Sequence, residues 1–166
     1  MIIIGIDPGL TGAVARIRQT GDPLVLTYQV WDAPTGKDGK HTVLLGREMK
    51  KILYEASCLP QVGTIDVIVF IEKVHSMPKQ CVASSFNFGQ GYGLWLGLIV
   101  GLGLPYEQVT PQRWQKETLA GMQGGKDASR IRAQELFPDA HLSRKKDHGR
   151  ADALLIAEYG RRTVGR

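Results

Sequence analysis

The sequence predicts an α/β fold, with a mixed five-stranded sheet flanked by helices on both faces. Residues 2 to 6 form a continuous apolar run, and residues 66 to 71 form a second one after the opening Asp66; such runs are typical of buried strands. Residues 13 to 19 and 23 to 30 follow the first run after tight turns, so the first three strands are expected to form an antiparallel meander. Helical patterns separate and follow the later strands. The resulting order, β-β-β-α-β-α-β-α, indicates helices on both faces of the sheet.

The first run, IIIGI, ends abruptly at Asp7-Pro8-Gly9, the pattern of a buried strand that delivers a carboxylate to a turn. After the third strand, residues 32 to 41 form a polar, Gly- and Lys-bearing segment that is predicted to be a loop. Thr42 then opens a helical pattern that is expected to cover one face of the sheet. Its apolar positions are Leu44, Leu45, Met49, Ile52 and Leu53.

The second apolar run, residues 66 to 71, also ends in an acidic residue, Glu72. Neighbouring parallel strands that end together would place Asp7 and Glu72 at one edge of the sheet, where the sites of α/β folds lie. A Gly-rich helix is expected at residues 84 to 104 and a further strand at 105 to 110. Three more helices are predicted, at residues 111 to 119, 126 to 136 and 150 to 161.

Composition indicates one globular domain spanning residues 1 to 166. The two cysteines form no CxxC pair, which argues against a disulfide scaffold or structural zinc and favours a reducing compartment. The apolar stretch at residues 93 to 105 is too short to cross a bilayer, and the N-terminal sequence lacks the basic region of a signal peptide. A soluble, intracellular protein without a membrane partner is therefore expected.

The positive charge is concentrated in the C-terminal third. Residues 1 to 110 hold 9 basic and 9 acidic side chains, whereas residues 111 to 166 hold 12 and 7. This asymmetry predicts a polyanionic partner for the C-terminal part, although a run of charges is usually only a solvated face. Trp114 lies within this part, where it could stack on a base or, as is commoner for tryptophan, be buried.

Asp152 lies among small apolar residues of the last predicted helix. Taken alone, it would be interpreted as a solvated side chain or a partner of the helix dipole. However, Asp7, Glu72 and Asp152 each interrupt an apolar environment, and carboxylates crowd together only when a cation neutralises them. Oxygen ligands favour Mg²⁺ or Mn²⁺ over zinc. A metal site for phosphodiester hydrolysis, with one ion activating water and another stabilising the leaving oxygen, fits this set.

The ligand that precedes Asp152 is left open between two neighbours. If the last helix includes His148, this residue lies one turn before Asp152 and shares its face. If the helix instead begins at Arg150, Asp147 becomes a loop ligand or an N-terminal capping residue.

Three acidic motifs resemble those of RuvC-like Holliday junction resolvases of the phage and bacterial branch, in the ribonuclease-H-like superfamily. They are Ile4-Gly5-Ile6-Asp7-Pro8-Gly9, Phe70-Ile71-Glu72 and Asp147-His148-Gly149-Arg150-Ala151-Asp152-Ala153-Leu154, with further likeness in the segments SMPKQ, SFNFGQGYG, TPQRW and ASRIRAQELFP. The resemblance implies a ribonuclease-H-like fold and a homodimeric crossover junction endodeoxyribonuclease. Such an enzyme cuts four-way DNA junctions by paired nicks, using two Mg²⁺ ions per active site, with Mn²⁺ able to substitute.

The resemblance also implies site roles. Asp7, Glu72 and Asp152 become metal ligands and catalytic residues, with the fourth ligand from Asp147 or His148. Members of the family commonly carry that ligand three residues before the final carboxylate, where this chain has Gly149, so the catalytic role is assigned to His148. Some members place an aromatic residue against the junction three positions after the central Glu, where this chain has His75. The predicted DNA contacts are His75, Lys79, Arg113, Lys116, Lys126, Arg130, Arg144, Lys145 and Lys146.

A glycine repeat marks the Gly-rich helix. Gly89, Gly93, Gly97 and Gly101 recur every four residues and form a stripe on one face. Each glycine destabilises a helix by about 1 kcal/mol relative to alanine, so the stripe implies that close packing against another element offsets this cost. The stripe packs either on the sheet of the same subunit or, as the resemblance favours, in a symmetric dimer.

The leading interpretation is a junction-resolving nuclease in the cytoplasm of a bacterial cell or phage-infected host. Two alternatives remain. A related nuclease could act on RNA or on other branched DNA, because fold and metal site do not select the substrate. A catalytically silent nucleic-acid-binding module would retain salt-sensitive binding without cutting.

Overall fold

The computed structural model describes residues 1–19, 26–58, 66–74, 82–125 and 127–165. Its central element is a five-stranded sheet of β1 (Ile2–Asp7), β2 (Ala13–Gln19), β3 (Leu26–Asp32), β6 (Val67–Glu72) and β7 (Tyr106–Val109). The strand order is β3-β2-β1-β6-β7. β1, β2 and β3 pair antiparallel, whereas β1 with β6 and β6 with β7 pair parallel. The predicted mixed sheet, with its antiparallel meander, is confirmed.

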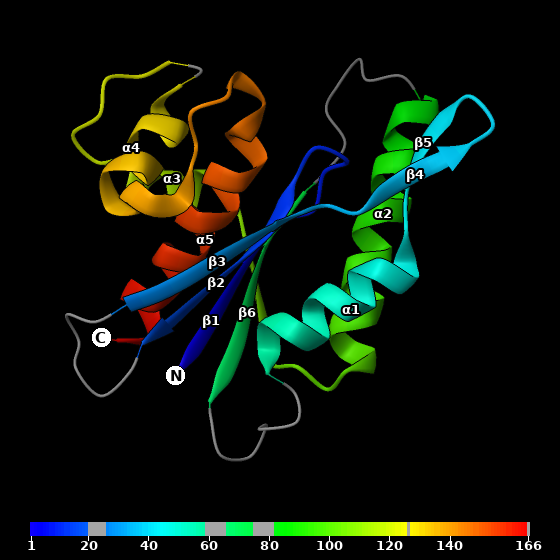
Figure 1. Ribbon diagram of the computed structural model, residues 1–166, viewed down its shortest axis with the longest axis horizontal. Coiled ribbons are helices and arrows are strands. Elements are labelled where there is room, and N and C mark those ends of the chain that lie inside the picture. Colours follow the sequence, from blue (N-terminus) through cyan, green and yellow to red (C-terminus); the bar gives the residue numbers. More distant parts are fainter. Residues whose placement is uncertain (20–25, 59–65, 75–81, 126, 166) are drawn as a thin grey trace.

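Helices cover both faces of this sheet (Figure 1). α1 (Gly46–Ser57) and α2 (Val82–Gly101) lie on one face; α3 (Pro111–Thr118), α4 (Ala128–Leu136) and α5 (His148–Val164) lie on the other. Two short 3₁₀ helices, Pro138–Ala140 and Lys145–Asp147, precede α5. The α/β class with helices on both faces is therefore confirmed.

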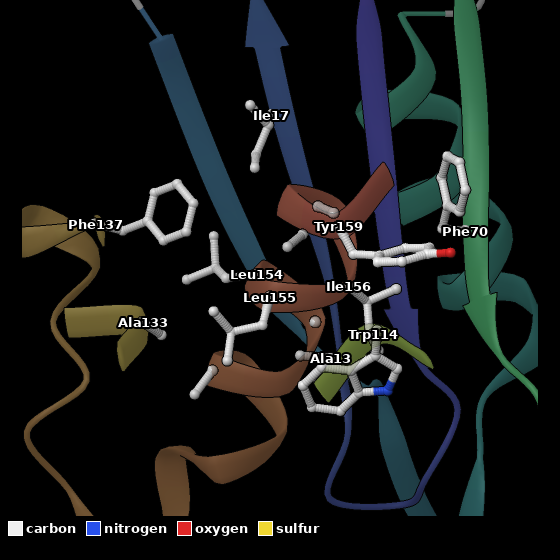
Figure 2. Packing of buried hydrophobic residues seen from close by; sticks show 14 of the residues in the cluster. Ala13, Ile17, Phe70, Trp114, Ala133, Phe137, Leu154, Leu155, Ile156 and Tyr159 are labelled. Carbon is white, nitrogen blue, oxygen red and sulfur yellow. The ribbon is translucent and has the colours of Figure 1, made fainter. Parts of the chain in front are cut away.

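β1 divides the core because its side chains alternate between the two faces. Ile2, Ile4 and Ile6 join a buried cluster with α1 and α2, whereas Ile3 joins the cluster formed with α3, α4 and α5. Figure 2 shows part of the second cluster, with Trp114 and Leu155 among its members. On the α5 side, a Cβ at Gly5 would overlap the carbonyl oxygen of Ala153. Glycine therefore allows α5 to cross directly over the central strand.

The predicted loop at residues 32 to 41 is wrong in part. β4 (Thr35–Asp38) and β5 (His41–Leu44) form a two-stranded antiparallel hairpin there. Its two-residue turn is Gly39-Lys40, between the paired residues Asp38 and His41, and Gly39 has the positive φ of 57° that a tight hairpin turn favours. Thr42 and Leu44 consequently lie in β5, and α1 begins only at Gly46. The β-branched Thr42-Val43 pair fits a strand better than the first turn of a helix.

Several other boundaries differ from the predictions, among them those of α2, which spans Val82–Gly101 and not residues 84 to 104. β3 begins at Leu26 and continues to Asp32; residues 23 to 25 of the predicted strand lie outside the described residues. α5 begins at His148 and not at Arg150, so His148 lies within the last helix. Among the described residues, no helix is long and apolar enough to span a membrane.

Candidate active site

Two carboxylates end neighbouring parallel strands at the same edge of the sheet. Ile6 of β1 pairs with Ile71 of β6. Asp7 and Glu72 are the next residues on these two strands, so they lie side by side at the strand ends. Both strands are buried along most of their length because helices cover both faces, and this brings the two acids to the rim of the core.

The third carboxylate comes from α5, which packs across β1 and β2. The approach allowed by Gly5 brings Asp152, the residue before Ala153, to the same edge of the sheet. Asp7 experiences the charges of both Asp152 and Glu72, so the three acids form one electrostatic group. Three residues that are far apart in the sequence thus meet at one place.

Burial raises the pKa of all three acids. The pKa of Asp7 rises to about 7, mainly through burial and further through the charges of Asp152 and Glu72, despite a hydrogen bond from the backbone of Gly9. Burial raises the pKa of Glu72 and of Asp152 in the same direction. Removing carboxylates from water without a neutralising cation disfavours their charged form, and a cation would reverse this.

Each acid has a different hydrogen-bonding environment. The backbone N–H of Gly9 donates to Oδ1 of Asp7 at 3.1 Å, and Nε1 of Trp114 donates to Oε1 of Glu72 at 2.8 Å. The hydroxyl of Ser129 hydrogen-bonds the carboxylate of Asp152 and lowers its pKa, opposing the effect of burial. Oδ1 of Asp152 is nevertheless buried without any hydrogen-bond partner.

The donor set suits a hard divalent cation. Buried polar atoms are almost always satisfied, so an unpartnered carboxylate oxygen beside two other acids needs a positively charged neighbour. Within the described ranges, no group of three His, Cys, Asp or Glu side chains already stands close enough together to enclose an ion. The carboxylate of Glu72 is bonded to Trp114 and that of Asp7 to Gly9. The types of ligand atom therefore fit a divalent cation, although the side chains are not arranged around one.

Asp147 does not join this group. Its side chain is 1% exposed, and Oδ1 accepts hydrogen bonds from Nη2 and Nε of Arg144 at 2.7 and 3.0 Å. Oδ2 accepts from the backbone N–H of Arg144, which closes a capping box on the 3₁₀ helix before α5. Although burial would raise the pKa of Asp147, its hydrogen bonds with Arg144 hold it below the usual range. Both oxygens of Asp147 are bonded to Arg144 in this arrangement, and its role as a metal ligand stays a prediction.

His148 occupies the position that the helical alternative required. It is the first residue of α5 and lies one turn before Asp152. The charge of His148 lowers the pKa of Asp152, and Nε2 of His148 lies 3.7 Å from Oδ1 of Asp127. The role of His148 as the fourth ligand stays a prediction.

The predicted DNA contacts are distributed unevenly. Arg144 holds Asp147, Arg130 pairs with Asp127 at 3.3 Å, and Arg113 pairs with Glu107 at 3.3 Å. Lys116 and Lys146 are exposed, and Lys146 lines a cavity of about 200 Å³ next to Thr11 and Gly12. His75, Lys79 and Lys126 lie outside the described residues, as does the side chain of Lys145.

Sequence reasoning missed two polar partners of the acids, Trp114 and Ser129. Trp114 is buried and bonded to Glu72, so the interpretation of it as a base-stacking residue is not supported. Its place one turn into α3, directly after a predicted strand, was the available signal. Ser129 lies in the first turn of α4 and has no sequence pattern that would connect it with Asp152.

Comparisons with known proteins concern the fold and the relatives of this chain. No family model matches the chain. A curated relative, "Holliday junction resolvase MOC1, chloroplastic" of Chlamydomonas reinhardtii, is 46% identical over 111 residues; these cover 63% of this chain and 12% of that protein's length. The solved structure of Thermus thermophilus RuvC has a TM-score of 0.59 at 18% identity and covers 99% of this chain and 97% of its own.

A second structure, T. thermophilus RuvC in complex with a Holliday junction substrate, has a TM-score of 0.58 at 18% identity and covers 98% and 96% of the two chains. The chain therefore has the fold of RuvC, and its resemblance to RuvC-like resolvases is confirmed.

Proposed function

We propose that this protein is a divalent-metal-dependent endonuclease that resolves four-way DNA junctions, with residues 1 to 166 acting as a single nuclease domain. One observation carries the proposal: Asp7, Glu72 and Asp152 come from three separate elements and are half-buried as one electrostatic group, with Oδ1 of Asp152 buried and unpartnered. The algal relative named as a Holliday junction resolvase and the RuvC fold supply the substrate class.

In this proposal Asp7, Glu72 and Asp152 hold the metal, and His148 is the fourth ligand. Three carboxylates joined by one imidazole form a mainly oxygen set that suits Mg²⁺, with Mn²⁺ as a substitute, and two ions per site would fit the hydrolysis of a phosphodiester. When bound, the ions supply activation of the attacking water and stabilisation of the leaving oxygen.

The protein's own residues prepare the site. The backbone of Gly9 fixes Asp7, and Ser129 hydrogen-bonds Asp152. Burial keeps the carboxylates poorly solvated, so that they favour the neutralised state that a cation provides. In this proposal the exposed Lys116 and Lys146 contact DNA phosphates; Lys146 lies beside the loop that follows Asp7.

We propose a homodimer joined through α2, because paired cuts require two active sites and one chain carries one acidic group. The glycine stripe of α2 faces open space in the chain, since a Cβ at each of its four glycines would meet nothing within 4 Å. Phe86 and Val100, which are 69% and 60% exposed, lie two helical turns on either side of Gly93 on the same face. The alternative that the stripe packs on its own sheet is not supported by these contacts.

A cleavage panel tests the proposal. Junction, flap, duplex and RNA–DNA hybrid substrates are incubated with and without Mg²⁺, and the cuts are mapped on both strands. Symmetric, Mg²⁺-dependent cuts in the junction support the proposal, provided that Asp152→Asn abolishes them. Preferred cutting of the hybrid or flap would make the protein a nuclease of another specificity. Metal-independent binding without cutting would make it a silent binding module.

The compartment follows from the substrate. We propose a compartment that contains recombining DNA, and the bacterial or phage-infected cytoplasm remains our expectation. The algal relative is named as chloroplastic.

A further inference from the structure

Among the described side chains, only the indole of Trp114 hydrogen-bonds Glu72, and it does so from inside the core. Nε1 donates to Oε1 of Glu72 at 2.8 Å, while the side chain as a whole is 1% exposed. A hydrogen bond to an ionised carboxylate is among the stronger ones in proteins, and burial removes competing water.

The backbone around Trp114 leaves it little freedom to move. Val109, the last residue of β7, pairs with Glu72 in the sheet, and the N–H of Lys73 donates to the carbonyl of Val109 at 2.7 Å. α3 begins two residues later with Pro111, and the N–H of Trp114 donates to the carbonyl of Thr110. The donor, Trp114, and the acceptor, Glu72, therefore belong to α3 and β6, and the pairing of β6 with β7 holds these two elements in place.

Trp114 also contacts the rest of the site's framework. It belongs to the buried cluster that includes Ala151, Leu155 and Ile156 of α5, the helix that carries Asp152 (Figure 2). The hydroxyl of Thr118 donates to the Trp114 carbonyl at 2.8 Å and holds the next turn of α3. Packing thus links the orientation of the indole to both strand β6 and helix α5.

We propose that Trp114 is a positioning residue for the metal site, with its indole N–H holding Oε1 of Glu72 so that Oε2 is the oxygen left to coordinate a divalent cation. This inference rests on the proposed function, since it requires Glu72 to be a ligand. Partners that orient a metal ligand through a hydrogen bond typically contribute 10- to 100-fold to metal affinity. A purely structural tryptophan would contribute to folding and leave metal affinity unchanged.

The chain contains a matched control. Trp95 of α2 is also fully buried, but its Nε1 has no hydrogen-bond partner and it lies in the cluster on the opposite face of the sheet. Trp114→Phe and Trp95→Phe both replace a buried indole by a smaller ring. Only the first removes a hydrogen bond from a proposed ligand.

Mn²⁺ binding is measured by calorimetry on the wild type and the two variants, without DNA. We expect Trp114→Phe to raise the dissociation constant for Mn²⁺ about tenfold or more, while Trp95→Phe leaves it within about twofold. Equal affinities for the wild type and Trp114→Phe would overturn the inference and leave the proposed function standing. A wild type that binds no Mn²⁺, with or without a junction, would overturn both.

A second measurement needs no folded variant of Trp114. The indole N–H resonances of ¹⁵N-tryptophan-labelled wild-type protein are followed during a Mg²⁺ titration, with Trp31 and Trp95 assigned by substitution. The Trp114 resonance should shift on Mg²⁺ binding and on the substitution Glu72→Gln, and the Trp95 resonance should not. If the chemical shift of the Trp114 resonance does not change under conditions where Mg²⁺ binds, the inference is overturned.

Discussion

Gly149 lies directly against the backbone of Thr11, so that a Cβ at Gly149 would overlap the Thr11 carbonyl oxygen. This contact joins the first turn of α5 to the loop that follows Asp7. It explains why the chain has glycine three residues before Asp152, where the resolvases it resembles commonly carry a ligand. A side chain there would push α5, and Asp152 with it, away from the sheet edge.

Substituting Gly149→Ala should therefore damage both stability and activity. Overpacking of a close contact typically costs about 1 to 3 kcal/mol of unfolding free energy. We expect a lower melting temperature and a marked loss of junction cleavage. Gly124→Ala is the matched control, since a Cβ at Gly124 meets nothing within 4 Å. Wild-type cleavage by a folded Gly149→Ala protein would contradict the requirement for this close approach.

Neutralising each acid should stop cleavage without weakening DNA binding. Asp7→Asn, Glu72→Gln and Asp152→Asn each remove one proposed metal ligand together with one negative charge. Because a catalytic metal supplies several kcal/mol of charge stabilisation, we expect rates to fall by about 100-fold or more. Junction affinity, measured without metal, should stay equal or increase, since less negative charge faces the phosphates. Full activity of any one variant would remove that residue from the site.

The raised pKa of Asp7 predicts how metal-free stability changes with pH. The folded protein keeps the Asp7 proton until about pH 7, whereas the unfolded chain releases it near the ordinary value of 3.8. Stability from this group is thus complete below about pH 4 and is lost as pH rises toward 7, with an upper limit of about 4 kcal/mol. The pKa values of Glu72 and Asp152 are raised by burial in the same direction.

Thermal melts in a chelator should accordingly show the melting temperature falling between about pH 5 and pH 8. Asp147 and Glu158 have lowered pKa values, so they stabilise the folded protein above their ordinary pKa. This contribution is lost only in more acidic conditions than this pH range. Asp7→Asn should flatten the decline, and Mg²⁺ should restore stability at the alkaline end. A melting temperature that rises across this range would show that the three acids are not buried together.

His148→Ala and Asp147→Ala should have different effects. His148 lies near Asp152, so its loss should lower Mn²⁺ affinity and cleavage, by about 10-fold or more if it is a ligand. Asp147 is buried and bonded to Arg144, so its removal should mainly lower the melting temperature. Cleavage and Mn²⁺ calorimetry separate the two. A larger loss of Mn²⁺ affinity at Asp147 would return the ligand role to that residue.

The strands could be predicted from sequence because their patterns are local. IIIGI is buried throughout and the second run is buried at Val69, Phe70 and Ile71, and both contain little that favours another structure. The hairpin at residues 35 to 44 was missed because its four-residue strands are short and exposed, with Asp38-Gly39 as the main clue. The start of α1 was misplaced for the same reason, since apolar residues of β5 continue the helical spacing by chance.

The acidic group could be predicted because each acid interrupts an apolar segment. Its hydrogen-bond partners could not, because they depend on contacts between distant elements. Trp114 and Glu72 are 42 positions apart, and the pairing of Asp147 with Arg144 competes with a ligand role that the motif alone suggests. Sequence patterns locate buried charge, but they do not show which oxygen is already bonded.

The glycine stripe of α2 gives the last prediction, which concerns assembly. Gly97→Leu places a side chain into open space in the single chain, and leucine favours a helix over glycine by somewhat less than about 1 kcal/mol. The monomer should therefore keep or slightly raise its melting temperature. In a dimer with closely approaching α2 helices, the same leucine would overpack the contact.

Overpacking by about 1 to 3 kcal/mol would weaken the dimer about 5- to 140-fold. Light scattering over a dilution series should show this shift, and Gly97→Ala should show a smaller one. Paired nicking of a supercoiled cruciform should then give way to single, uncoupled nicks, because each chain carries one acidic group. A folded Gly97→Leu protein that remains dimeric and still makes paired cuts would show that the subunits meet through another surface, since the stripe already faces away from its own sheet.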